Sequence, residues 1–405
     1  MLTHLGDISV ADFLAHYWQK KPLIIRGLFP GYECPLDEND LAGLATEEEV
    51  ESRLVYEELN GQPWQLEHGP FSIEKLESMP LQGWTLLVQG LDTWVPEVAD
   101  LLDRFRFLPN WRVDDVMASF APPGGSVGPH FDHYDVFLIQ ATGARRWRIG
   151  PPCDDQSPRV DGTPLRILQN FEQTEEWVLE PGDALYLPPR YAHYGVAETS
   201  CITLSVGFRS PTYAELMSAL ADDWFENPAL STHLHDATEE PLSNPGLISD
   251  DVFADIKSRL QALLDDEAGL RRSFGRFISA PKFDAAVPPL EADMRLSPED
   301  AGESLQDQEI QWRWNEGSRY TYSLYEEAGA RRVMFAVDGE AYDADERFAP
   351  LVEILCRSNN IDRERLLPWS ADKDALKLLS SLLNRGSLVL EGFDDDEEDW
   401  DDDDA

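Results

Sequence analysis

Short hydrophobic runs separated by turns dominate the middle of the chain, from about residue 117 to residue 210. The runs are VMASFA, DVFLIQA, RRWRIG, EWVLE, ALYLPP, HYGVA and CITLSVGF, and glycine, proline or aspartate stands between most of them. Short strands that recur roughly every 8 to 12 residues are typical of a β-barrel or sandwich. We therefore predict a β-rich core for this part of the chain.

After residue 211 the spacing of apolar residues changes to that of helices. Three segments space their apolar residues three or four apart, as an amphipathic helix does. They are YAELMSALADDWF, DDVFADIKSRLQALL and GLRRSFGRFIS. We predict a helical region over residues 211–285.

The last third of the chain mixes both patterns. Two strand-like runs, SRYTYSLYE and RRVMFAVDG, precede two helical patterns, RFAPLVEILCRS and ADKDALKLLSSLLNRG, and a short strand, SLVLEG. This order predicts a small winged-helix-like α+β domain over residues 286–392. Such domains often bind DNA, but this one has no basic patch, so we expect a structural or protein-contact role.

The predicted fold class is therefore mixed α+β, with four parts. Residues 1–210 hold the β-rich core and an N-terminal elaboration of short helices and strands. Residues 211–285 are helical, and 286–392 form the C-terminal domain. The acidic tail at 393–405, FDDDEEDWDDDDA, is predicted to be disordered.

Composition places the protein among cytoplasmic globular proteins. A hydrophobic content of 42% with 12 tryptophans is enough for a real core. No apolar run is long enough to span a membrane, and the first residues, MLTHLGDISVADFLAHYW, lack the pattern of a signal peptide. The four cysteines are far apart and form no CxxC pair, which favours a reducing cytoplasm.

The charge of the chain is extremely acidic. It has 77 acidic and 33 basic residues, for a net charge of −44, and ten of the acidic residues lie in the tail. Such a surface should repel nucleic acid and anionic membranes and attract basic partners. An adaptation to a salty cytoplasm explains the same charge without a partner, and the two explanations are compatible.

A candidate metal site begins in the segment HFDHYD. Side chains alternate faces along a strand, so His130 and Asp132 would share one face and His133 and Asp135 the other. Two histidines and one carboxylate form the facial triad of non-haem Fe(II) oxygenases, which leaves positions open on the ion. A third ligand is therefore needed.

The third ligand is predicted to be His193, in EPGDALYLPPRYAHYGVA. A glycine turn, a short strand and a rigid Pro188–Pro189 turn precede it, whereas the other histidines outside HFDHYD lie before or after the β-rich block. We expect His133 to be a surface or supporting histidine. Asp135 is expected either to pair with a nearby arginine or to face the substrate.

These segments resemble the JmjC family of Fe(II)- and 2-oxoglutarate-dependent oxygenases. The resemblance also includes FLAHYWQKKPLIIRG, LPNWRVDDVMASFAPPGGSVGPHFDHYDVFLIQATGARRWRIG and SVGFRSP. It is closest to the bacterial ribosomal oxygenases, which are arginine 3-hydroxylases acting on large-subunit ribosomal protein sixteen. The resemblance is strong over residues 1–210, and the rest of the chain shares only the general plan of the family. It implies a double-stranded β-helix, or cupin-like jelly roll, followed by a helical dimerisation region and a winged-helix-like domain.

The resemblance also implies roles for single residues. His130, Asp132 and His193 fall on the metal triad of the family. Arg145, fifteen positions after His130, falls on the residue that anchors the distal carboxylate of 2-oxoglutarate. An arginine can grip a carboxylate through two hydrogen bonds, although strand parity alone does not choose Arg145 over its neighbour. Ser119 falls on a hydroxyl that assists this contact, and a small residue packed in a strand is an equally good reading of it.

Tyr134 and Asp135 would contribute to the substrate mouth, and an acidic mouth could hold a target guanidinium. The implied activity is hydroxylation of an arginine β-carbon (C3), with Fe(II) as cofactor and 2-oxoglutarate and O2 as co-substrates. The implied partners are a basic ribosomal protein and a second copy of the chain, with no direct binding to nucleic acid or membrane.

Three alternatives stay open. The substrate could differ within the family, as in histidine hydroxylation or N-methyl demethylation. The metal site could belong to a cupin that does not use 2-oxoglutarate. The chain could also be a non-enzymatic adaptor whose acidic tail and C-terminal domain bind basic proteins, but three convergent metal ligands argue against that interpretation.

Overall fold

The computed structural model describes residues 1–225, 233, 234, 244, 246–283 and 287–392. The chain divides into two compact units, Met1–Ser210 and Pro211–Ala405, each with its own hydrophobic core. The acidic tail at 393–405 lies outside the described residues, and the predicted four-part division of the chain stays a prediction.

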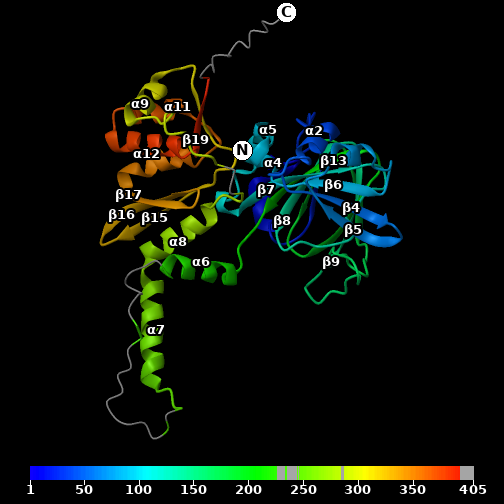
Figure 1. Ribbon diagram of the computed structural model, residues 1–405, viewed down its shortest axis with the longest axis horizontal. Helices are drawn as coiled ribbons and strands as arrows, with labels where there is room; N and C mark the ends of the chain where they lie inside the picture. Colours follow the sequence, from blue (N-terminus) through cyan, green and yellow to red (C-terminus); the bar gives the residue numbers. More distant parts are fainter. Residues whose placement is uncertain (226–232, 235–243, 245, 284–286, 393–405) are drawn as a thin grey trace, which may run out of the picture. The chain divides into compact units, whose positions relative to one another are not determined.

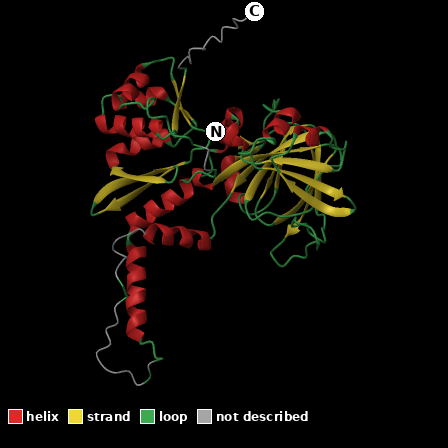
Figure 2. Ribbon diagram, in the orientation of Figure 1, coloured by secondary structure: helices red, strands yellow, loops and turns green. Residues whose placement is uncertain are grey.

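Two antiparallel sheets form the core of the first unit (Figures 1 and 2), and β1 and β2 make a separate two-stranded sheet. The larger sheet has the strand order β3-β11-β8-β13-β7-β6-β4-β5, and the smaller has the order β10-β9-β12. The strands from the predicted β-rich block are β7 (Val113–Ala121), β8 (Asp135–Thr142), β9 (Arg145–Pro152), β10 (Glu175–Leu179), β11 (Ala184–Leu187), β12 (Tyr191–Ala197) and β13 (Cys201–Phe208). The chain passes repeatedly between the two sheets, which confirms the predicted jelly-roll core.

The central strands of the larger sheet, β8, β11 and β13, are buried on both faces. Phe137 and Ile139 of β8 pack against the N-terminal elements, whereas Val136 and Leu138 belong to the core between the two sheets. Strands buried on both faces need nearly continuous apolar runs, because no side faces water. This explains why DVFLIQA and CITLSVGF are mostly hydrophobic on both faces.

The N-terminal elements extend and cover the larger sheet. Their strands are β1 (His4–Leu5), β2 (Ile8–Ser9), β3 (Leu23–Ile25), β4 (Ser52–Leu59), β5 (Gln62–His68) and β6 (Trp84–Val88). Their helices are α1 (Val10–His16), α2 (Glu38–Leu44), α3 (Ile73–Glu77), α4 (Leu91–Trp94) and α5 (Pro96–Leu102), with short turns η1 (Asp103–Phe105) and η2 (Asn110–Arg112). Phe13 of α1 and Phe105 pack on Phe137 and Tyr186 of the larger sheet. This aromatic cluster fixes the helices to the sheet.

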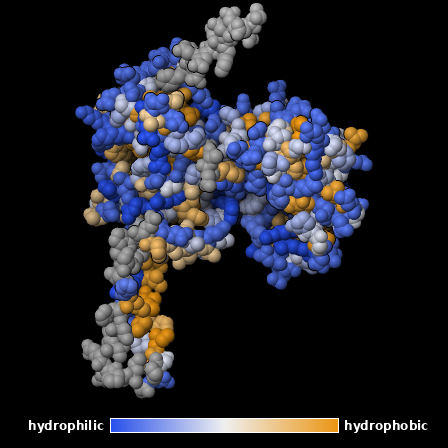
Figure 3. Space-filling view, viewed as in Figure 1, coloured by the Kyte–Doolittle hydropathy of each residue, from blue (hydrophilic) through white to orange (hydrophobic). Residues whose placement is uncertain are grey.

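Three helices open the second unit, where the sequence predicts them: α6 (Tyr213–Phe225), α7 (Asp250–Asp265) and α8 (Glu267–Ser279). No residue of α7 is buried, and Phe253 and Leu260 are 56% and 53% exposed. Figure 3 shows the resulting hydrophobic stripe along this helix. No helix in the described part of the chain is long and apolar enough to cross a membrane.

The rest of the second unit is a small α+β arrangement. Its strands are β14 (Gln311–Trp314), β15 (Tyr320–Glu327), β16 (Ala330–Val337), β17 (Glu340–Asp345), β18 (Asn360–Ile361) and β19 (Leu388–Glu391). Its helices are α9 (Pro298–Gln306), α10 (Ala349–Leu355), α11 (Arg363–Leu366) and α12 (Lys373–Asn384), with turns η4 (Glu346–Phe348) and η5 (Leu367–Trp369). The sheet β15-β16-β17 packs α8 on one face and shares a core with α10 and α12 on the other.

The turn between β8 and β9 provides a test of the packing. Gly143 has φ +61°, and a Cβ there would lie 2.1 Å from the carbonyl oxygen of Ser200. Gly61, in the turn between β4 and β5, has φ +76° but open space around it. Each Gly→Ala change costs about 1 kcal/mol of left-handed strain, and the overlap at Gly143 adds about 1–3 kcal/mol.

We therefore expect Gly143→Ala to melt at a clearly lower temperature than Gly61→Ala in differential scanning calorimetry. Equal melting temperatures for the two variants would contradict the close approach at Ser200.

Candidate metal centre and co-substrate pocket

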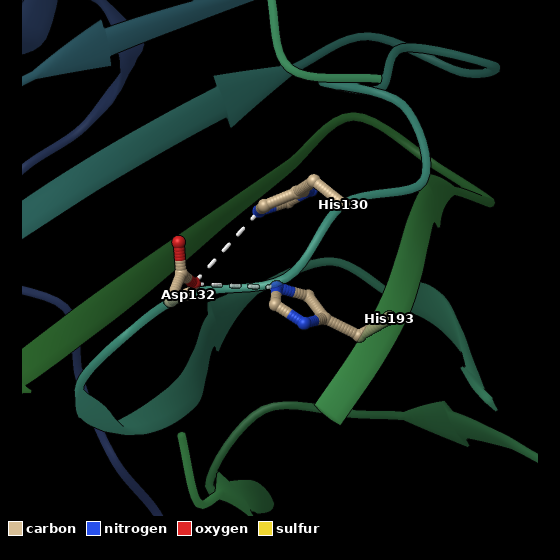
Figure 4. A group of neighbouring side chains, drawn as sticks. All are labelled: His130, Asp132 and His193. Atoms are coloured by element: carbon tan, nitrogen blue, oxygen red, sulfur yellow. Dashed lines mark ion pairs between the residues drawn. The ribbon is translucent and has the colours of Figure 1, made fainter. Parts of the chain in front are cut away.

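His130, Asp132 and His193 point their ligand atoms at a common centre (Figure 4). The Nε2 atoms of His130 and His193 lie 3.9 Å and 3.6 Å from Oδ2 of Asp132, and the three ligand atoms lie within 4.8 Å of one another. Two metal bonds of about 2.1 Å span up to about 4.2 Å, so small side-chain movements let all three bind one ion. Within the described residues this is the only group of three or more His, Cys, Asp or Glu side chains that could hold a metal.

The two histidine rings are oriented for metal binding. Nδ1 of His130 lies 2.9 Å from the carbonyl oxygen of Gly128, and Nδ1 of His193 lies 3.0 Å from that of Tyr191. Each Nδ1 therefore carries the proton and donates it, which leaves the Nε2 lone pair for a metal. Burial and the neighbouring His130 lower the pKa of His193 to about 4. His193 is consequently neutral, as a ligand must be, near pH 7.

Backbone hydrogen bonds join the two segments that carry the ligands. The N–H of His130 donates to the carbonyl of His193 (3.0 Å), and the N–H of His193 donates to that of His130 (2.8 Å). The N–H of Arg190 donates to the carbonyl of Asp132 (2.6 Å), from a left-handed conformation with φ 73°. The proline turn before Arg190 thus aims a backbone donor at the segment 130–132.

The local structure around these ligands differs from the prediction. β8 begins only at Asp135, residues 131–134 form a loop, and His130 makes an isolated bridge to His193. The loop and its bridge, and not the alternation of a strand, bring His130 and Asp132 together. The side chain of His133 is 46% exposed and lies 3.3 Å from Asp155, and Asp135 is fully buried against Arg112.

Arg145 points into the space between the sheets. It lies opposite Ala197 in the β9–β12 pairing, while Ile149 on the same face lies opposite His193. The side chain is 2% exposed, and its Nε and Nη2 atoms are buried without a hydrogen-bond partner among the described residues. The adjacent Arg146 points outward and pairs with Glu176 and Glu198.

The guanidinium lies over the ring of Trp147, 5.8 Å from its centroid, but a ring offers no hydrogen-bond acceptor to Nε and Nη2. Two buried N–H donors without an acceptor are costly, so a ligand that supplies a carboxylate suits Arg145. Ser119 is buried on the interior face of β7, opposite Thr203 of β13, whose hydroxyl donates to Oε1 of Gln140 on β8 at 3.2 Å. Gln140 and Thr203 were not predicted from the sequence. Each is a polar residue inside a mostly apolar strand, β8 and β13, and this was the available signal.

A cavity of about 470 Å³ opens beside the metal ligands. Its lining includes His130 and Asp132 but not Arg145 or Ser119. Three arginines line it beside the carboxylates, namely Arg53, Arg166 and Arg209, so its mouth is not simply acidic as the net charge suggested. Tyr134 also lines the cavity, and the charge of Asp132 together with burial raises its pKa well above the ordinary value.

Two parts of the chain match known protein families. Residues 100–216 match the JmjC domain, which contains the three candidate ligands and Arg145. Residues 262–389 match the ROXA-like winged helix, which confirms the predicted character of the C-terminal domain.

Whole proteins are similar as well. The ribosomal protein uL16 3-hydroxylase of Escherichia coli is 34% identical over 94% of this chain and 97% of its own length. A probable ribosomal oxygenase of Haemophilus influenzae is 41% identical over 53% of each chain. The solved structure of YcfD, a ribosomal oxygenase from E. coli in complex with cobalt and 2-oxoglutarate, covers 96% of this chain and 99% of its own, with 32% identity and a TM-score of 0.80. This chain therefore belongs to the family of JmjC-domain ribosomal oxygenases.

Proposed function

We propose that this protein is an Fe(II)- and 2-oxoglutarate-dependent dioxygenase that hydroxylates C3 of an arginine in ribosomal protein uL16. The observation that carries this proposal is the convergence of His130, Asp132 and His193, together with Arg145 between the same two sheets, whose buried Nε and Nη2 have no hydrogen-bond partner among the described residues. The named substrate of the E. coli relative supports the choice of uL16.

The bound iron, with 2-oxoglutarate and O2, supplies the chemistry that places one oxygen atom into a C–H bond. The chain supplies three ligands, so a six-coordinate ion keeps positions for the co-substrates. Arg145 binds the distal carboxylate of 2-oxoglutarate and fixes its orientation, assisted by Ser119. The buried rings and chains of Trp147, Ile149 and Leu185 keep water away from this end of the site.

The cavity beside His130 and Asp132 is the entrance for the target side chain. Its volume of about 470 Å³ admits an extended arginine, and Asp114 lines it as a carboxylate that could pair with a guanidinium. The net charge of −44 draws a basic protein toward the enzyme and disfavours nucleic acid and anionic membranes as partners. This enzyme would act in the cytoplasm, on a ribosomal protein and not on RNA.

Removal of Asp132 tests the activity. We expect the wild-type protein, given Fe(II) and 2-oxoglutarate, to add one oxygen atom to an arginine of uL16, as read by tandem mass spectrometry. Asp132→Ala removes the only carboxylate ligand, so turnover should fall at least about a hundredfold. His68→Ala, an exposed histidine at the end of β5, should retain wild-type turnover.

A different mass change in the substrate would contradict the proposed activity. An oxygen atom found on a histidine, or the loss of a methyl group from a methylated residue, would assign one of the alternative activities. An unmodified uL16 with intact 2-oxoglutarate turnover would sink the substrate assignment.

The two adjacent arginines of β9 test the co-substrate pocket. Arg145→Ala should raise the KM for 2-oxoglutarate by about a hundredfold, because it removes a charge-assisted pair worth roughly 3 kcal/mol. Arg146→Ala breaks only exposed ion pairs, so its KM should stay unchanged. An unchanged KM in Arg145→Ala would show that the pocket binds something other than 2-oxoglutarate.

The exposed face of α7 supports the expected homodimer. Its apolar residues recur along one side of the helix, and Phe253, Leu260 and Leu264 are all about half exposed. Apolar stripes of this kind are normally covered by a partner helix, because the exposure of apolar surface to water is unfavourable. A second copy of the chain supplies an identical stripe and would bury both.

A charge on this face should separate the protomers. We expect Leu260→Glu to give a monomer in sedimentation velocity, whereas Ser258→Glu, on the polar side of the same helix, should leave the dimer intact. A dimer that persists in Leu260→Glu would place the interface elsewhere.

A further inference from the structure

A buried charged cluster lies next to residues 130–134, called here the metal loop, and has no part in the mechanism proposed above. Asp135 is fully buried at the start of β8. Its Oδ1 accepts from the hydroxyl of Tyr186 (2.6 Å), and its Oδ2 accepts from Nη2 of Arg112 (2.8 Å) and Nε2 of Gln19 (3.3 Å). All three donors come from segments far from Asp135 in the sequence.

Arg112 extends the cluster to the end of β13. Its Nε donates to the carbonyl of Arg209 (3.0 Å) and its Nη2 to that of Phe208 (3.1 Å). The guanidinium also lies over the ring of Trp18, 5.3 Å from its centroid. One arginine therefore holds both the entry to β8 and the backbone of Arg209, a residue that lines the cavity.

The position of Asp135, directly after the loop, makes these bonds important. Ser126, His130 and Asp132 all attach the metal loop to β12 and the turn before it, through Gly195, His193 and Arg190. Only two residues, His133 and Tyr134, separate Asp132 from Asp135. Asp135 thus attaches the outgoing end of the loop to the larger sheet.

Stability alone does not explain an ion pair at this place. Aromatic side chains surround it, among them Trp18, Phe137 and Phe208. Removing two charges from water is costly, and apolar residues of similar volume often stabilise such a site equally well or better. Unlike apolar contacts, an ion pair with several directed hydrogen bonds fixes the relative positions of the segments that it joins.

We propose that Asp135 and Arg112 are positioning residues, which hold the loop 130–134 so that Asp132 is presented to the metal. This proposal rests on the proposed function, since it assumes that His130, Asp132 and His193 bind the ion. The pair acts through the loop backbone and does not touch metal or substrate.

The test separates metal affinity from stability in the full-length protein. Asp135→Asn and the double variant Arg112→Met/Asp135→Leu are titrated with Co(II) by calorimetry, and the visible spectrum of bound Co(II) reports the ligand geometry. Each variant should bind Co(II) about tenfold more weakly than the wild type and show an altered spectrum. The double variant should melt at a higher temperature than Asp135→Asn, because it leaves no unpaired charge, although the hydroxyl of Tyr186 loses its acceptor.

Asp183→Asn is the matched control. Asp183 is also buried and accepts from Nη1 of Arg26 (2.5 Å) and the N–H of Gly27 (2.9 Å), in the turn before β11. It lies at the opposite end of β11 from the residues that pair with the start of β8. We expect it to lower the melting temperature and leave Co(II) affinity and spectrum unchanged.

Wild-type Co(II) affinity and spectrum in Arg112→Met/Asp135→Leu would overturn the proposal while leaving the proposed function intact. Wild-type protein that binds no Co(II), or whose binding survives Asp132→Ala, would overturn the proposed function and this inference with it.

Discussion

The backbone hydrogen bonds between segment 130–132 and segment 190–193 are the constraint on which the site depends. They join two parts of the chain about sixty residues apart, and they place a ligand on each side of the join. Because backbone groups make them, they hold His130, Asp132 and His193 together without any contribution from a metal. A site whose ligands are held before the ion arrives loses less side-chain and loop entropy on binding it. The left-handed Arg190, which follows two prolines, belongs to this join through its N–H.

The smaller sheet sets the distance between the two ends of the pocket. His193 and Ala197 lie on the same face of β12, about 13 Å apart along the strand, and Arg145 faces Ala197. Gly195 lies between them, where a Cβ would be 2.6 Å from the Trp147 ring. The glycine therefore lets the indole lie flat against β12, between the metal ligands and the guanidinium. A metal end, an apolar middle and a cationic end suit a small dicarboxylate that binds the metal through one terminus.

Sequence patterns predict the strands of the core and the identity of the ligands better than their local structure. Strong apolar runs mark β8, β11 and β13, because burial on both faces demands them, whereas alternation and turn residues mark β9 and β12. The loop at 131–134 escaped prediction, since HFDHYD alternates like a strand while its backbone bonds to β12. Parity could not choose Arg145 over Arg146, because the choice depends on which face of β9 looks inward. The partner of Asp135 could not be predicted from the sequence either, because Arg112 lies in a separate turn and only the fold brings the two residues together. β17 was missed because EAYDAD has too few apolar residues to mark a strand.

The charge of the chain acts on two different length scales. A net charge of −44 produces a field that raises the encounter rate with a basic protein, but salt screens exposed charges beyond about 8 Å at physiological ionic strength. Selection of one side chain must therefore come from groups inside the cavity. There the carboxylates of Asp114 and Asp132 stand among Arg53, Arg166 and Arg209. A cationic side chain that enters would be attracted by these two carboxylates and repelled by the three arginines, so the net charge of the chain does not by itself decide which side chain the cavity accepts. On the proposed function, the acidic surface would raise the encounter rate with basic proteins, and the mixed cavity would decide which of their residues approaches the metal.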